Sequence, residues 1–175
     1  MKQMLIVAIL LIGWIYPAGA GTDDMEVIQK AFPGCMQTRC VVDENLGGHD
    51  EDFEPALEAL LRKVLLVPLI INGSCHSWCA LAADMLNVND PRLVCVTPKA
   101  VLEFHKGYTL EWVVEEGRIV ELTYDFEDPP HSVPVLEWVN GKGGFPIALW
   151  DTDMLKMPFE DASKIWRTCT PEEMN

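Results

Sequence analysis

One serine and one histidine in this sequence stand where acyl-transfer chemistry could take place. Residues 72–80 lie between an apolar run that we expect to be a strand and another that we expect to be a helix. A serine in that turn, Ser77, would stand at the helix N-terminus, where backbone N–H groups and the helix dipole favour a developing negative charge. The tetrahedral intermediate of acyl transfer needs such stabilisation. Ser77 is therefore a candidate nucleophile.

His105 is the candidate general base for Ser77. It ends a predicted strand over residues 100–105. Two neighbouring parallel strands would bring both side chains to the same edge of a sheet, where the active groups of α/β proteins gather. His105 could then take the serine proton. The residues alone leave two other roles open, because Ser77 could be only a helix cap and His105 only a hydrogen-bonded core residue.

The segments around the candidate serine predict an α/β fold. Apolar positions recur at helical spacing over residues 53–64, with acidic residues first and basic residues last, which is typical of an amphipathic helix. The apolar run 65–71 fits a strand buried on both faces, although Pro68 argues against a central position because it cannot donate to the ladder. Residues 72–74 predict a sharp turn, and the apolar run 77–86 predicts a buried helix.

The remaining segments complete this pattern. A short strand is predicted at residues 93–96, and the alternation of strands and helices around it indicates an α/β protein. Two alternating segments within residues 110–126 predict a β-hairpin with one apolar face. Ser132 could cap a following helix. Thr170 and Glu173 form a capping box for a terminal helix.

Two motifs resemble the secreted or periplasmic relatives of the Clp protease proteolytic subunit, within the crotonase-like fold. They are G-x-C-x-S-x-C-A over residues 73–80 and P-K-A-x-x-x-F-H over residues 98–105. The resemblance covers about residues 38–107 well and 130–175 loosely. It implies an α/β fold of the Clp-protease and crotonase kind, a spiral of mostly parallel strands with covering helices, here with the added hairpin. It also implies that the protein is a serine hydrolase, specifically a peptidase, that needs no cofactor.

The resemblance also implies roles for individual residues. Ser77 would be the nucleophile and His105 the general base. The family's third catalytic member is an acid near the C-terminus, and Asp161 stands at the matching position. The turn at Gly47 and Gly48 matches the glycine pair that supplies one oxyanion N–H group, which would come from Gly48. Trp78, the residue after the nucleophile, would supply the second oxyanion N–H group.

Departures from the family pattern keep a second function open. The segment before Gly47 lacks the family's serine–proline pair, and the given sequence stops soon after the last predicted helix begins. The hairpin also stands where the Clp subunit carries a helical handle. Because that handle makes oligomer contacts, the sequence leaves open whether the protein is a homo-oligomer. The alternative function is an exported binding or structural protein that keeps the fold without activity.

Residues 1–20 predict a cleavable signal peptide. Lys2 precedes an apolar run over residues 4–15, and small residues in an A-x-A pattern end at Ala20. The run is shorter than the roughly 20 residues of a membrane-spanning helix. We therefore expect cleavage after Ala20 and a single domain over residues 21–175 that is secreted or periplasmic, with no stable membrane association.

The charge of the remaining chain bounds its partners. Without Lys2, 12 of the 13 basic residues remain against 27 acidic residues, a formal charge of −15. Such a surface repels nucleic acid and anionic lipid. The charge therefore predicts no nucleic-acid partner, and the partner that the resemblance implies is a peptide or another acyl substrate.

Six cysteines in an exported chain predict disulfides, with 15 pairings to choose from. Cys75 and Cys79 would lie one helical turn apart, which is poor geometry for a bridge, so we expect each to pair elsewhere. These two cysteines with His76 do not have a usual zinc or haem spacing. We expect no metal. His76 itself is expected at an exposed helix start, and His131 in a solvated loop.

Overall fold

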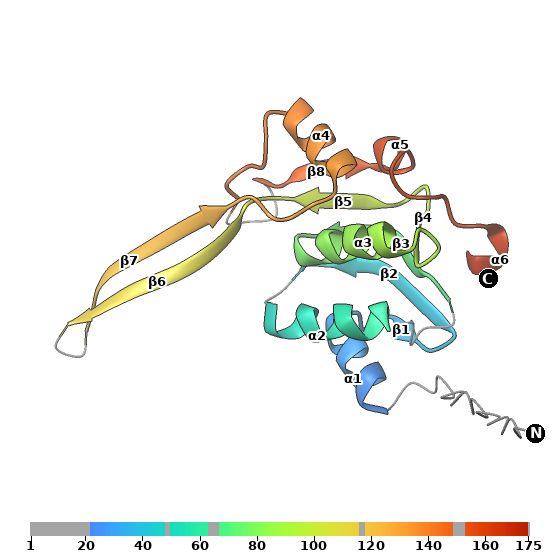
Figure 1. Ribbon diagram of the computed structural model, residues 1–175, viewed down its shortest axis with the longest axis horizontal. Helices are drawn as coiled ribbons and strands as arrows, with labels where there is room; N and C mark the ends of the chain where they lie inside the picture. Colours follow the sequence, from blue (N-terminus) through green and yellow to red (C-terminus); the bar gives the residue numbers. More distant parts are fainter. Residues whose placement is uncertain (1–21, 48–49, 63–66, 116–117, 149–152, 175) are drawn as a thin grey trace, which may run out of the picture.

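The protein is built around a mixed, mostly parallel sheet, with helices packed against it and a separate hairpin (Figure 1). The computed structural model describes residues 22–47, 50–62, 67–115, 118–148 and 153–174. The strands are β1 (Cys35–Met36), β2 (Arg39–Asn45), β3 (Leu69–His76), β4 (Val94–Val96), β5 (Val101–Phe104), β6 (Gly107–Glu115), β7 (Arg118–Glu127) and β8 (Leu155–Pro158). The helices are α1 (Thr22–Ala31), α2 (Asp50–Leu61), α3 (Trp78–Asn89), α4 (Val133–Gly141), α5 (Phe159–Ala162) and α6 (Pro171–Met174).

The main sheet has the strand order β1–β2–β3–β5–β8, with β4 also paired to β3. The pairs of β3 with β2, β4 and β5 are parallel, whereas β1–β2 and β5–β8 are antiparallel. β3 pairs with β4 through Leu69–Ile71 and with β5 through Ser74–His76, so one central strand holds two strands in succession. This arrangement confirms the predicted α/β class and the mostly parallel sheet.

The helices and the sheet share one apolar core. In Figure 1, α1 and α2 lie at one end of the molecule and α4 and α5 at the other, with α3 between them. In α3, the five residues 79–83 and Leu86 have buried side chains, as expected for the apolar run 77–86. Aromatic contacts connect these helices: Phe53 of α2 stacks on Trp78 of α3 and meets Phe32, the residue after α1, edge to face.

The predicted turn at residues 72–74 is wrong. These residues continue β3, which starts only after Pro68 and runs to His76. A β-bulge in β3 accommodates them, because Asn72 and Gly73 together lie opposite the single residue Asp43 of β2, where the register shifts. A Cβ on Gly73 would lie 1.8 Å from the carbonyl O of Asp43. Gly73 is therefore required for the close approach of two strands and does not reverse the chain.

Other predicted elements occur close to their expected positions. The amphipathic helix is α2, and the strand at residues 93–96 is β4. The hairpin is β6–β7, paired from Gly107 opposite Glu127 to Glu115 opposite Arg118. Figure 1 shows this hairpin extending away from the sheet. β8, which the sequence analysis did not assign, completes the sheet by pairing antiparallel to β5.

The two predicted caps differ in outcome. At the terminal helix α6, the backbone N–H of Thr170 donates to Glu173 Oε2 at 2.9 Å, and the N–H of Glu173 donates to Thr170 Oγ1 at 3.4 Å, which confirms the capping box. Ser132 stands at the N-cap of α4, but its side chain makes no capping hydrogen bond. Its hydroxyl donates instead to Asp84 Oδ1 at 2.7 Å.

Three disulfides join all six cysteines: Cys35–Cys40, Cys75–Cys79 and Cys95–Cys169. They confirm the prediction of disulfides and fit an oxidising compartment. The expectation that Cys75 and Cys79 pair elsewhere is wrong. It assumed one helix, but Cys75 lies on β3 and Cys79 on α3, and the turn between them places their Cα atoms 5.3 Å apart, a usual separation for a bridge.

Within the described ranges, no helix is long and apolar enough to cross a membrane. The predicted signal peptide, residues 1–20, lies outside the described residues.

Candidate functional site

Ser77 occupies a sharp turn between β3 and α3. Its φ is 49° and its ψ is −114°, and it is the one residue other than glycine with positive φ in the described part of the chain. Residues with a Cβ rarely adopt such a backbone, and it persists where surrounding contacts impose it. Here the N–H of Ser77 donates to the carbonyl O of Glu103 at 2.8 Å, and its own carbonyl accepts from Leu81 N at 3.0 Å. The turn is therefore fixed on the sheet side and on the helix side.

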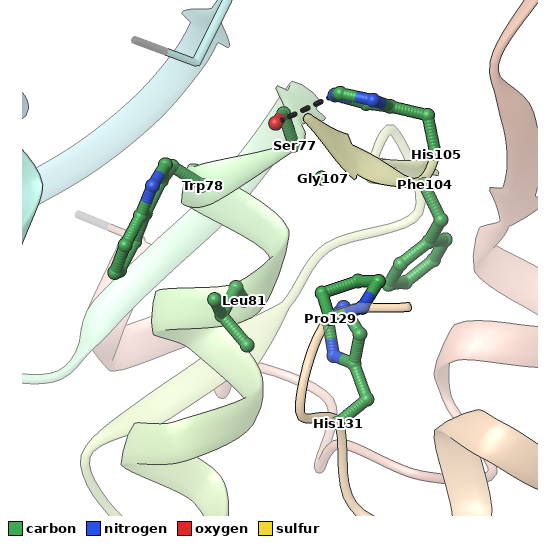
Figure 2. Close-up of a pocket in the computed structure, with 8 residues that line it drawn as sticks. All are labelled: Ser77, Trp78, Leu81, Phe104, His105, Gly107, Pro129 and His131. Carbon is green, nitrogen blue, oxygen red and sulfur yellow. Dashed lines mark hydrogen bonds between the residues drawn. The ribbon is translucent and has the colours of Figure 1, made fainter. Parts of the chain in front are cut away.

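His105 lies beside Ser77 because β3 and β5 are parallel neighbours. His76 pairs with Glu103, and Ser77 and His105 follow just beyond the paired ends of the two strands. The distance between Ser77 Oγ and His105 Nε2 is 2.7 Å. Figure 2 shows this hydrogen bond between the turn and the end of β5. The structure thus brings together the two residues that the sequence paired as nucleophile and base.

The second ring nitrogen of His105 fixes its tautomer. Nδ1 lies 2.5 Å from the backbone carbonyl O of Lys106. A carbonyl oxygen only accepts, so Nδ1 must carry the proton in the neutral ring, and Nε2 presents its lone pair to the hydroxyl of Ser77. The Ser77 hydroxyl therefore donates to His105, which is the orientation that a general base requires.

The structure does not bring Asp161 to His105. Asp161 lies in α5, which follows β8 beyond the pair Val101–Pro158, whereas His105 follows Phe104 at the opposite end of β5. Its carboxylate accepts from Trp138 Nε1 at 2.9 Å and from Lys164 Nζ at 2.6 Å. The hydrogen bond from Lys164, followed by that from Trp138, lowers the pKa of Asp161. These contacts tie α5 to α4.

The glycine turn before α2 lies against Ser77. Gly47 has a φ of 74°, and a Cβ on it would lie 3.0 Å from Ser77 Cβ and 3.1 Å from the carbonyl O of His76. Its N–H donates to Asn45 Oδ1 at 2.9 Å, while Asn45 Nδ2 donates to the carbonyl O of Ala31 at 2.7 Å. The N–H of Gly47 is thus committed to the turn itself.

Of the two predicted oxyanion donors, the structure describes only Trp78. Gly48 lies outside the described residues. Trp78 is the first residue of α3, directly after Ser77 and at the positive end of the helix dipole. The indole of Trp78 stacks on Phe53, with ring centroids 6.0 Å apart. This contact joins α2, which follows the glycine turn, to α3, which follows Ser77.

A pocket opens beside the Ser77–His105 pair. It holds about 350 Å³ of space, part of it open to solvent. Figure 2 shows its walls on α3, on β5 and on the segment that follows the hairpin. The lining residues are Ser77, Trp78, Leu81, Phe104, His105, Gly107, Pro129 and His131. Apart from the serine and the two histidines, the walls are apolar side chains and a glycine.

A buried acid supports one wall of this pocket. Asp84 of α3 is 1% exposed, and its Oδ2 accepts from His131 Nδ1 at 3.0 Å and from the backbone N–H of Ser132 at 2.7 Å. Burial pushes the pKa of Asp84 upward, but the hydrogen bonds from His131 and Ser132 outweigh it and leave the pKa below its ordinary value. His131 also packs against the rings of Phe104 and Phe145.

The sequence analysis missed Asp84 and misplaced His131. His131 is 9% exposed, so the solvated loop expected for it is wrong. One signal was present, because Asp84 is the acid within the otherwise apolar run 77–86. A carboxylate on a helix that is apolar nearly all round must be buried, and a buried carboxylate needs partners.

A second buried ionic group lies directly under the turn. His76 Nε2 is 3.1 Å from Glu103 Oε1, and Lys156 Nζ is 3.1 Å from Glu103 Oε2. The side chains of His76 and Glu103 are 7% and 2% exposed, so the expectation of an exposed His76 is wrong. His76 belongs to β3 and not to a helix start. The group joins β3, β5 and β8 at the end of the sheet that carries Ser77.

Among the described residues, no three histidine, cysteine, aspartate or glutamate side chains are grouped as ligands for a metal ion.

No protein-family model, curated protein or solved structure matches this chain.

Proposed function

We propose that the protein is an exported serine hydrolase that cleaves peptides or other acyl compounds. The observation that carries the proposal is the Ser77–His105 hydrogen bond of 2.7 Å, with His105 Nδ1 turned to the Lys106 carbonyl. Together these two contacts leave the lone pair of Nε2 facing the serine hydroxyl. The strained turn that holds Ser77 is a further feature of strand–turn–helix nucleophile sites.

In this mechanism Ser77 Oγ attacks the acyl carbonyl carbon while its proton moves to His105 Nε2. The carbonyl oxygen becomes an oxyanion, which the N–H groups of Trp78 and Gly48 would stabilise. The imidazolium then returns the proton to the leaving group, the bond to that group breaks, and an acyl-enzyme remains. Water repeats the sequence, with His105 again taking and returning one proton, and releases the acid.

The Lys106 carbonyl takes the orienting role that the sequence analysis gave to Asp161. It holds the tautomer of His105 as a carboxylate would. It bears no net charge, so it stabilises the imidazolium less than a carboxylate does. We therefore propose a dyad of Ser77 and His105 oriented by the main chain, on a fold of the Clp-protease and crotonase kind.

The pocket indicates the class of acyl group. Its walls include Trp78, Leu81, Phe104 and Pro129, which favour an apolar substituent beside the carbonyl under attack. The proposed compartment is secreted or periplasmic, with the signal peptide removed after Ala20, and the disulfides fit it.

A fluorophosphonate probe tests the proposal, because it forms a covalent bond with an activated serine hydroxyl. The purified, oxidised protein should be labelled, and Ser77→Ala and His105→Ala should abolish the labelling. Ser74→Ala is the matched control, since Ser74 lies three residues away on β3, and it should be labelled like the parent. A folded parent that resists the probe would support the alternative of a binding protein without activity.

A further inference from the structure

The disulfide Cys75–Cys79 closes the segment that has Ser77 at its centre. Cys75 is the second-last residue of β3, and Cys79 is the second residue of α3. Both side chains are 0% exposed. The bond therefore crosses beneath the turn and connects its two ends inside the core.

The two ends of this disulfide belong to structurally different parts of the site. Cys75 pairs with Asn45 of β2 on one side and with Leu102 of β5 on the other, so it is fixed within the sheet that also positions His105. Cys79 belongs to the first turn of α3, next to Trp78. The bond thus ties the start of the helix to the strand that is paired with the base-carrying strand.

The backbone of Ser77 needs such a constraint. Its φ of 49° is unfavourable for a residue with a Cβ. The main-chain hydrogen bonds of Ser77 run to Glu103 and from Leu81, and main-chain hydrogen bonds at the end of a helix open readily in local fluctuations. A covalent link across the same few residues limits the conformations to which the turn can relax.

We propose that the Cys75–Cys79 disulfide is a positioning element that holds Ser77 within hydrogen-bonding distance of His105. This inference rests on the proposed function, because it assigns the disulfide a part in the reactivity of Ser77. The other two disulfides have different locations. Cys35–Cys40 joins β1 to β2, and Cys95–Cys169 joins β4 to the segment before α6.

The test compares Cys75→Ala/Cys79→Ala with Cys35→Ala/Cys40→Ala. The two disulfides are matched, since their sequence separations are 4 and 5 and all four side chains are 0% exposed. Loop closure and loss of sulfur therefore affect stability similarly in the two variants. The readout is the rate of fluorophosphonate labelling at several probe concentrations, which separates the maximal rate from the probe affinity.

The expected result is a fall in the maximal labelling rate of at least about tenfold in Cys75→Ala/Cys79→Ala, with the probe affinity little changed. Cys35→Ala/Cys40→Ala should retain the labelling rate of the parent. If both variants react like the parent, the positioning role is refuted while the proposed function stands. If both lose the rate equally, disulfides stabilise the fold in general and the specific role is again refuted.

A second measurement reads the turn without using activity. Hydrogen exchange of the Ser77 N–H, which donates to Glu103 O, should be at least about tenfold faster in Cys75→Ala/Cys79→Ala than in the parent or the control variant. An unchanged exchange rate of the Ser77 N–H contradicts the inference even when no labelling occurs. If the parent is not labelled but exchange is faster in Cys75→Ala/Cys79→Ala, the proposed hydrolase activity is refuted and the structural role of the disulfide stands. Cys75→Ser/Cys79→Ser, closer in volume, serves if the alanine variant does not fold.

Discussion

Gly47→Ala should reduce the reactivity of Ser77 through contact with the nucleophile. Gly47 has a φ of 74°, and its missing Cβ would lie 3.0 Å from Ser77 Cβ and 3.1 Å from the carbonyl O of His76. Ordinary contacts of a Cβ atom are 3.4–4 Å. The alanine must therefore displace either the glycine turn or the serine by a few tenths of an ångström.

The magnitudes follow from these two effects. Placing an alanine at positive φ destabilises the fold by about 1–2 kcal/mol. The added contact with Ser77 moves the nucleophile relative to His105. Because a displacement of about 1 Å can reduce a reaction rate by about two orders of magnitude, a shift of a few tenths of an ångström should reduce labelling by roughly tenfold.

Gly143→Ala is the matched control. Gly143 also has positive φ, at 105°, but a Cβ there would meet no atom within 4 Å. This variant should be destabilised by about 1–2 kcal/mol or slightly more, for the same backbone reason, and should keep the labelling rate of the parent. Urea denaturation measures the stabilities, and fluorophosphonate labelling measures the rates. Equal labelling rates in the two alanine variants would refute the reasoning that the Gly47 turn lies against the nucleophile.

Three further predictions concern the stability of the fold. Arg167 donates two hydrogen bonds to the Glu173 carboxylate, at 2.8 and 2.7 Å, and lowers the pKa of Glu173 from 4.5 to about 2. The ionised form therefore stabilises the fold above about pH 4.5, and this contribution is lost as the pH falls to about 2. Glu173→Gln should lower the free energy of unfolding by about 1–2 kcal/mol at pH 7 and hardly at all near pH 2, as measured by urea denaturation at each pH. Removing the Cys95–Cys169 disulfide, whose sequence separation is 74, should lower the free energy of unfolding by about 4 kcal/mol, because it closes a long loop of the unfolded chain. Removing either short disulfide should lower it by about 2 kcal/mol. Equal losses would contradict this dependence on loop length. Asp84→Asn should lower the free energy of unfolding by about 3 kcal/mol at neutral pH, because the buried side chain of His131 loses its carboxylate partner. A denaturation midpoint like that of the parent would show that the Asp84–His131 pair does not stabilise the fold.

The elements that carry Ser77 and His105 were predictable from local patterns. The pattern consists of a buried strand, a serine that opens an apolar helix and a histidine at the end of a later strand. It places Ser77 and His105 at one sheet edge whenever the two strands are parallel neighbours. The amphipathic spacing of α2 and the alternation of the hairpin were similarly local signals.

The errors arose where a partner distant in sequence decides the structure. Residues 72–74 have strong turn propensity, but the pairing of β3 with β2 and β5 keeps them extended. Asp43, which lies opposite the bulge at Gly73, is about 30 residues earlier in the chain. The extension of β3 also decides the pairing of Cys75, because it moves this cysteine out of the helix. One wrong turn therefore produced the wrong disulfide expectation as well.

The group that orients His105 could not be predicted from the residue types because it is a main-chain carbonyl. A backbone carbonyl, here that of Lys106, leaves no signature in side-chain types. Asp161 had a suitable position in the sequence, but β8 runs antiparallel to β5 and carries it to the far end of the strand pair. Only the pairing direction distinguishes these outcomes, and the four residues of β8 are too few to predict it.

The most direct test of the central claim is to locate the fluorophosphonate adduct by mass spectrometry. The proposed function predicts one phosphonyl group per chain, attached to the hydroxyl of Ser77, on the peptide that contains the Cys75–Cys79 disulfide. It also predicts no adduct in His105→Ala, because the hydroxyl then has no base to accept its proton. An adduct on another residue, or none on a folded and fully oxidised protein, would contradict the assignment of Ser77 as the nucleophile.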